Sequence, residues 1–118
     1  MINFDKENCL IEKKSKFFGY LLYCNDEKQI KNALDYLKVE HKKATHICYA
    51  YRLSSPFAEK AVDDGEPSGT AGRPILNVLQ KKNLNNVVVF IVRYFGGIKL
   101  GAGGLVRAYS KTTGDLLK

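Results

Sequence analysis

The sequence is poor in cysteine and has no long apolar run. Its three cysteines, Cys9, Cys24 and Cys48, are widely spaced and form no CxxC pair, so neither a disulfide framework nor a zinc site is expected. Each is expected to pack as a small hydrophobic side chain. The longest apolar run, residues 87–92, is too short to span a bilayer, and residues 1–5 lack the basic start and apolar stretch of a signal peptide. A cytoplasmic protein without membrane contact is therefore expected.

The composition is that of one globular domain. The chain has 118 residues, of which 45% are apolar and 26% charged, and it contains no low-complexity tract, internal repeat or linker. Its net charge is +7, and residues 83–118 alone contribute +4. This basic C-terminal part favours a polyanion or an acidic protein as partner. A lysine-rich solvated surface would give the same composition without such a partner.

The hydrophobic periodicity alternates between strand and helix patterns. It predicts four strands, over residues 7–12, 14–24, 45–53 and 86–95. It also predicts three helices, one capped by Asp26, one beginning at Pro74 and one over residues 105–112. Residues 54–72 are expected to form a long loop, and loops of this length are usually functional or disordered. The order of elements predicts an α/β fold of the α+β sandwich type, with one sheet and helices mainly on one of its faces.

The first stretch that could carry chemistry lies in this loop. Its candidate residues are three carboxylates, two hydroxyls and an arginine: Asp63, Asp64, Glu66, Ser68, Thr70 and Arg73. Carboxylates in such a cluster could bind a hard cation, or one of them could act as a general base if burial raised its pKa. The alternative, which the chemistry alone favours, is a turn leading into a helix with Ser68 or Thr70 as its N-cap.

The second stretch is a glycine-rich turn between the last strand and the last helix. Together with Arg73 of the acidic loop, three cations and five glycines of this turn are the candidate anion-binding residues: Arg93, Lys99, Arg107, Gly96, Gly97, Gly101, Gly103 and Gly104. Backbone amides at a helix N-terminus suit a phosphate, and arginine binds phosphate through charge-assisted bonds. The turn is neither a Walker A loop nor a GxGxxG motif. The alternative is that the glycines only permit positive φ and close packing.

The histidines give little support for a catalytic triad. His46 and Cys48 are expected on the same face of one strand, but no third group is available to orient them. A histidine that is solvent-facing or satisfied by hydrogen bonds is the simpler interpretation of His46. We expect no metal and no cofactor. We also expect the acidic loop and the glycine-rich turn to meet at one end of the sheet.

Both stretches strongly resemble the IMPACT/YigZ family. The matching segments are DDGEPSGTAGRPIL at 63–76 and VRYFGGIKLGAGGLVRAY at 92–109, with smaller matches at 14–17 and 44–46. The resemblance implies a ribosomal-protein domain-two-like fold with a left-handed βαβ crossover and a mixed sheet. It also implies that residues 1–118 form a single Impact N-terminal-type domain. The ferredoxin-like C-terminal domain of bacterial relatives and the RWD domain of eukaryotic relatives are not expected in this chain.

The resemblance also frames the function. Eukaryotic relatives bind the activator of a kinase that phosphorylates a translation initiation factor, whereas bacterial relatives have no assigned reaction and a suspected nucleic-acid affinity. The leading hypothesis is a non-enzymatic binding module in translation or its regulation, with RNA, a nucleotide or a ribosome-associated protein as partner. The alternatives are an enzyme acting on a phosphorylated small molecule or nucleotide, with the acidic loop and His46 at its site, and a pure protein-interaction domain.

Overall fold

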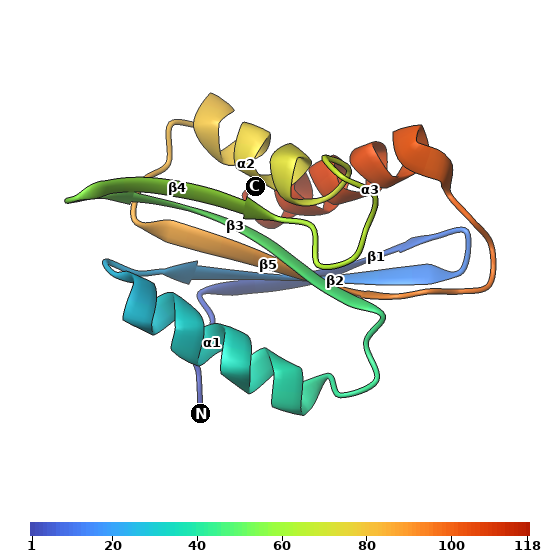
Figure 1. Ribbon diagram of the computed structural model, residues 1–118, viewed down its shortest axis with the longest axis horizontal. Coiled ribbons are helices and arrows are strands. Elements are labelled where there is room, and N and C mark those ends of the chain that lie inside the picture. The colour runs from blue at the N-terminus through green and yellow to red at the C-terminus, as the bar shows by residue number, and fades with distance from the viewer.

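The computed structural model describes all residues, 1–118, as one five-stranded sheet with three helices. The elements are β1 (Lys6–Glu12), β2 (Ser15–Tyr23), α1 (Glu27–Glu40), β3 (His46–Ser54), β4 (Phe57–Val62), α2 (Gly72–Lys81), β5 (Val87–Tyr94) and α3 (Gly101–Leu116). Figure 1 shows α1 on one face of the sheet and α2 and α3 together on the other. None of the helices is long and apolar enough to cross a membrane.

The central strand β5 explains why both faces of the sheet are covered. Val87, Val89 and Ile91 point into the core beneath α2 and α3, whereas Val88, Phe90 and Val92 point into a second core beneath α1. All six side chains are completely buried. The α/β fold class is therefore confirmed, and the expectation of helices mainly on one face holds for α2 and α3, while α1 covers the other face. A strand that is apolar on both faces needs a helical layer on each side.

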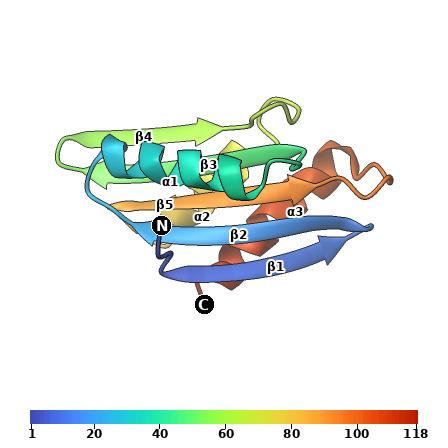
Figure 2. The same ribbon diagram turned by 90° about the horizontal axis from the view of Figure 1, so that it is seen from below.

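Helix α1 forms as the sequence predicts. The Asp26 carboxylate accepts a hydrogen bond of 2.9 Å from the backbone N–H of Gln29, which satisfies one of the free amides at the helix start. Ile30, Ala33 and Leu37 follow at helical spacing and are buried against the sheet. Helix α1 lies over β3 and β5 and leaves the edge strand β1 uncovered (Figure 2).

This gap in coverage separates the cysteines into two classes. Cys24 and Cys48 are buried as small hydrophobic side chains, as expected, whereas Cys9 on β1 is exposed. Cys9 was expected to be buried because its neighbours in the sequence are apolar. Cys9 instead lies on the part of the sheet that α1 does not cover, so its side chain stays exposed.

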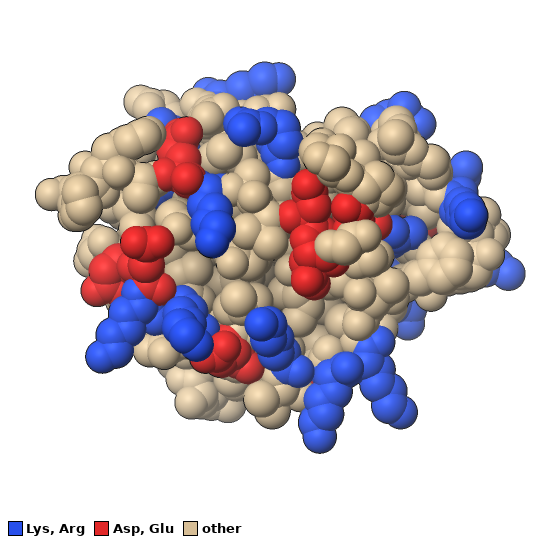
Figure 3. All heavy atoms as spheres, in the orientation of Figure 1, with Lys and Arg blue, Asp and Glu red and all other residues tan.

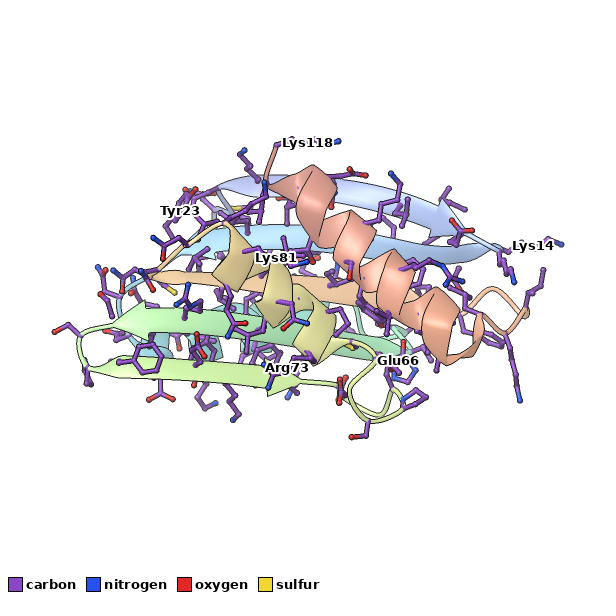
Figure 4. The ribbon with its side chains drawn as sticks, turned by 90° about the horizontal axis from the view of Figure 1, so that it is seen from above. Lys14, Tyr23, Glu66, Arg73, Lys81 and Lys118 are labelled. Carbon is purple, nitrogen blue, oxygen red and sulfur yellow. The ribbon has the colours of Figure 1, made fainter.

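The strand order is β1-β2-β5-β3-β4, and every neighbouring pair is antiparallel. The expected mixed sheet is therefore wrong. Parallel strands occur in this sheet only as next-nearest neighbours, and β4 and β5 are such a pair, because both run antiparallel to β3. Helix α2 connects these two strands, and the crossover is left-handed in Figures 2 and 4. It confirms the handedness that the family resemblance implies, against the usual rule.

Strand β4 was not predicted, since residues 54–72 were expected to be a loop throughout. It pairs with β3 along its whole length, from Phe57 opposite Ser54 to Val62 opposite Tyr49. As an edge strand it contains no fully buried residue. The regular alternation of apolar and polar residues that marks a half-buried strand is therefore missing from its sequence.

The end of the sheet that carries the candidate site is held by a close contact between two turns. Gly96, just after β5, packs on the β1–β2 turn so closely that an added Cβ would lie 2.1 Å from the backbone carbonyl of Lys14. The Gly96 N–H also donates to the Ser15 hydroxyl at 3.2 Å. The glycine-rich turn and the β1–β2 turn are thereby joined side by side.

This contact predicts opposite effects for two glycine substitutions. Gly96→Ala should lower the free energy of unfolding by about 1–3 kcal/mol, because the new methyl group meets backbone atoms. Gly114→Ala, in α3 with no atom near the added Cβ, should instead raise it by about 0.5–1 kcal/mol. Urea denaturation of both variants checks this. A Gly96→Ala variant as stable as the wild type would contradict the close approach of the two turns.

Candidate functional site

A cleft of about 430 Å³ opens at this end of the sheet, and we call it the central cleft. It lies between the acidic loop after β4, the first residues of β3, the end of β5 and the start of α3. Its lining residues are Thr45, His46, Glu66, Pro67, Arg93, Phe95, Lys99, Leu100, Gly101, Ala102 and Leu105. Figure 4 shows Glu66 between the loop and the first turn of α3. The acidic loop and the glycine-rich turn therefore meet, as expected from the sequence.

The floor of the cleft is a buried ion pair between Glu66 and Arg93. Arg93 Nη1 donates to the two carboxylate oxygens of Glu66 at 2.9 and 2.8 Å, and both side chains are less than one-tenth exposed. Tyr109 adds a hydroxyl hydrogen bond of 2.6 Å to the same carboxylate. Arg93 was expected to be an anion contact, but its positive charge is neutralised inside the protein.

The rest of the Arg93 guanidinium is also enclosed. Nη2 donates to the Ser15 hydroxyl at 3.3 Å, and Nε is buried without a hydrogen-bond partner. The guanidinium carbon lies 5.5 Å from the ring centre of Phe17 and 5.6 Å from that of Phe95. These are cation–π distances. The paired side chain thus links the acidic loop, β2 and β5 with the aromatic residue that follows the strand.

His46 completes the charged floor from the side of β3. Its Nδ1 lies 2.8 Å from the backbone carbonyl oxygen of Asp64, and a carbonyl oxygen only accepts, so Nδ1 carries a proton. Its Nε2 lies 3.3 Å from a carboxylate oxygen of Glu66. This contact is an ion pair when Nε2 is protonated too. The expectation of a histidine satisfied by hydrogen bonds is confirmed.

Cys48 and Tyr109 lie behind this floor and stay protonated. The Cys48 thiol donates to the carbonyl oxygen of Asp63 at 3.0 Å and contacts the Tyr109 hydroxyl at 3.4 Å. Burial is the main cause that raises the pKa of the Cys48 thiol and of the Tyr109 hydroxyl far above their ordinary values. A thiol in such a setting is a poor nucleophile. The structure therefore gives no support to a Cys48–His46 catalytic pair.

The carboxylates of the acidic loop point to different partners. Asp63 accepts backbone hydrogen bonds from Gly69, Ala71 and Gly72 at 2.9, 3.2 and 2.9 Å. Asp64 accepts one of 2.7 Å from the Ile47 N–H. Together with Glu66, which faces Arg93, these side chains do not gather into a metal-ligating group.

The Asp63 carboxylate therefore caps the start of helix α2, although Asp63 lies eight residues before the N-cap residue, Ala71. Ala71 itself provides no side-chain hydrogen bond. The expectation that Ser68 or Thr70 is the N-cap is wrong. The Thr70 hydroxyl donates to the carbonyl oxygen of Pro67 at 2.6 Å, and Ser68 is exposed. Burial would raise the pKa of Asp63, but the three N–H bonds to its carboxylate lower it below the ordinary range.

The remaining basic candidates do not line one common cleft. Lys99 lines the central cleft and is exposed. Arg73 is exposed on α2, outside the cleft (Figure 4). Arg107 extends over the first turn of α3, and a Cβ added at Gly103 would lie 3.3 Å from its Nη1. Arg107 also lines a separate groove between β1 and α3.

The five glycines of the turn serve different purposes. Gly97 and Gly101 adopt φ of +90° and +74°, which only glycine adopts without strain. Gly96 permits the contact with Lys14 described above. Gly103 and Gly104 lie in the first turn of α3 beneath Arg107. These positions support the alternative of positive φ and close packing, and the helix start has no side-chain cap.

Sequence reasoning missed three lysines that the fold brings to this end. Lys14 and Lys16 line a hollow of about 340 Å³, which we call the lysine hollow, together with Phe18, His41, Tyr94 and Phe95. Lys13 lines the β1–α3 groove with Arg107. Antiparallel pairing places Lys16 opposite Tyr94. The Lys14–Phe17 motif was noticed in the sequence, but its position depends on the strand order, which the pattern of residues does not contain.

Together these cations form what we call the basic end, defined by Lys13, Lys14, Lys16, Lys99 and Arg107. All five side chains are exposed, and none of them belongs to an ion pair. Figure 3 shows Lys and Arg side chains along the right-hand end, where the β1–β2 turn and the loop before α3 lie in Figure 1. The main acidic cluster in this view lies further inward.

Comparison with known proteins places this arrangement in a family. The Impact N-terminal domain family matches residues 13–117. The IMPACT family member YvyE of Bacillus subtilis is 44% identical over 110 residues, which are 92% of this chain and 51% of that protein. The chain therefore belongs to the Impact N-terminal domain family, and the resemblance noted in the sequence is confirmed. The chain spans about half the length of the curated relatives it matches.

Two solved structures share the fold. A crystal structure of a hypothetical protein superposes with a TM-score of 0.90 at 35% identity, covering 95% of this chain and 56% of the other. The structure of Yih1, described as a two-domain translational regulator, gives a TM-score of 0.65 at 24% identity, covering 99% of this chain and 48% of the other. The second likeness shows the fold alone.

The buried ion pair predicts that Arg93 stabilises the fold. Arg93→Ala should lower the free energy of unfolding by about 3–5 kcal/mol, because it leaves the Glu66 carboxylate buried without its main partner. Lys99→Ala, which removes an exposed charge from the same cleft, should change stability by less than about 0.5 kcal/mol. Thermal and urea melts distinguish the two. An Arg93→Ala variant that melts like the wild type would show that Arg93 is a free surface cation instead.

The capping role of Asp63 predicts a pH-dependent stability difference. Asp63→Asn replaces one of the two acceptor oxygens by an NH2 group and removes the negative charge, so it should lower the free energy of unfolding by about 1–2 kcal/mol at neutral pH, whereas Ser68→Ala should have no effect. The folded-state pKa of Asp63 is depressed, so its contribution is complete above the unfolded-state pKa and disappears as pH falls through the folded-state pKa. The difference between wild type and Asp63→Asn should shrink below about pH 4. A difference that stays constant at acidic pH would refute the assignment.

Proposed function

We propose that the chain is a binding module that acts in translation or its regulation, and that RNA binds at its basic end. Membership of the Impact N-terminal domain family supports the general role. The fold likeness to Yih1, which is described as a translational regulator, agrees with it. The basic end supports RNA as the partner, because unpaired cations clustered beside an exposed aromatic side chain, here Phe95, are typical of nucleic-acid surfaces.

The observation that carries this proposal is the conformation of the β1–β2 turn. Lys13 and Lys14 adopt φ of +46° and +66°, a two-residue hairpin geometry in which Asn-Gly is strongly preferred. A non-glycine residue in this region costs roughly 1–2 kcal/mol. Backbone strain of this kind is concentrated at functional sites. Two lysines held here at a cost in stability support a role of their charge in binding.

Binding is better supported than catalysis. Behind the floor of the central cleft, Cys48 stays a thiol and is not an activated nucleophile. Asp63 and Asp64, which the enzyme hypothesis assigned to cation binding or general base catalysis, accept backbone hydrogen bonds instead. The residues whose charge is free for a ligand lie on the rim of the cleft and beyond it, as a surface that tracks an extended polyanion requires.

The strained turn predicts that binding and stability respond in opposite directions. Lys13→Asn/Lys14→Gly should raise the melting temperature, because both new residues suit the turn, and weaken binding of single-stranded RNA. Each lost phosphate contact reduces the slope of log affinity against log salt by about 0.7, so the slope should become less steep by about 1.4. Fluorescence anisotropy with a labelled RNA oligonucleotide over a salt series measures both quantities.

Lys81→Ala/Lys82→Ala is the matched control, since it removes two exposed lysines at the opposite end of the molecule. It should leave the affinity and the salt dependence close to those of the wild type. The proposal fails if the wild-type chain binds no RNA, or if the control weakens binding as much as the turn variant does.

A further inference from the structure

Phe95 is an aromatic side chain exposed at the boundary between two concave surfaces. It follows directly after β5 and is 46% exposed. Its ring lines both the central cleft and the lysine hollow. Arg93 lines the central cleft but not the lysine hollow, and its guanidinium covers the ring on the cleft side. The part of the ring that lines the lysine hollow is therefore not covered by Arg93.

The backbone that carries the ring is held in place by its surroundings. The Phe95 N–H donates to the Thr45 hydroxyl at 3.0 Å, and the next residue, Gly96, is bonded to Ser15 and packed on the β1–β2 turn. The guanidinium behind the ring is itself fixed by Glu66. A ligand that stacks on Phe95 thus meets a preorganised backbone and an arginine already fixed behind the ring, so it has little chain freedom to suppress.

The lysine hollow combines aromatic walls with two free cations. Phe18 and Tyr94 pack edge to face with their ring centres 5.8 Å apart, and the Tyr94 hydroxyl bonds His41 Nδ1 at 2.6 Å. Burial is the main cause that lowers the pKa of His41, so the wall stays uncharged at neutral pH. Lys14 and Lys16 are the charged members of the lining. The hollow therefore offers a π-face and phosphate partners within one volume.

We propose that an unpaired nucleobase of single-stranded RNA stacks on Phe95 in the lysine hollow, while its neighbouring phosphates contact Lys14 and Lys16. This inference rests on the proposed RNA-binding function and adds strand type and a stacking residue to it. Bases of a duplex are already stacked inside it and cannot reach the ring, so the site selects single strands. An acidic protein would need the lysines but not an open aromatic face.

The first test compares Phe95 with another exposed phenylalanine. Phe95→Leu keeps an apolar group against Arg93 but removes the aromatic face, and Phe95→Ala removes the side chain altogether. Phe57→Ala, at the β3–β4 turn, removes a side chain that is 67% exposed and away from the hollow. Both Phe95 variants should bind single-stranded RNA about 10- to 100-fold more weakly, the usual effect of losing one base stack. Phe57→Ala should bind like the wild type.

The second test detects stacking directly. The chain contains no tryptophan, so Phe95→Trp introduces a single fluorophore that retains a stacking face. Addition of a single-stranded oligoadenylate of about 12 nucleotides should quench its emission. The same RNA should leave the emission of Phe57→Trp unchanged, and polyglutamate, which carries charge but no base, should leave both unchanged.

The outcomes separate this inference from the function on which it rests. Weaker binding by both Phe95 variants, with quenching of Phe95→Trp, supports base stacking. Unchanged affinity of Phe95→Leu and Phe95→Ala, while Lys13→Asn/Lys14→Gly still weakens RNA binding, overturns the stacking site and leaves RNA binding in place. Equal affinity for duplex and single-stranded RNA, tighter binding to polyglutamate, or no RNA binding by the wild type also overturns the inference, and the last of these overturns the proposed function as well.

Discussion

The buried ion pair between Glu66 and Arg93 holds the functional end of the molecule together. Glu66 belongs to the loop after β4, and its carboxylate is bonded by Arg93 from β5 and by Tyr109 from α3. A carboxylate that is almost completely buried needs such partners, because an unpaired charge in the interior is strongly destabilising. Meeting this need draws the loop, the central strand and the last helix toward one point, above which the central cleft opens.

This arrangement separates structural charge from free charge. The floor of the cleft has its charges neutralised by one another, whereas the five cations of the basic end stay exposed and unpaired around it. Phe95 lies between the two regions, with its ring against Arg93 on one side and the lysine hollow on the other. Arg93 was expected to bind a ligand itself. It instead packs against Phe95, whose ring is open to a ligand on its other side.

Local features of the fold could be predicted from the sequence, and features set by strand order could not. The Asp26 cap of α1 and the two-sided apolar strand β5 follow from nearby residues, and the second of these already implies helices on both faces. Asp63, in contrast, caps α2 across a loop, so no N-cap pattern reveals it. Lys14 and Lys16 reach the site because β2 pairs with β5, and Arg93 is buried because a remote glutamate faces it.

A double-mutant cycle on Glu66 and Arg93 tests the central claim most directly. The free energies of unfolding of Glu66→Gln, Arg93→Met and the double variant are measured by urea denaturation. If the pair is the buried link described here, the double variant is destabilised by much less than the two single variants together, with a coupling of about 2–3 kcal/mol. Additive effects within about 0.5 kcal/mol would show that the two side chains act independently, which would contradict the account.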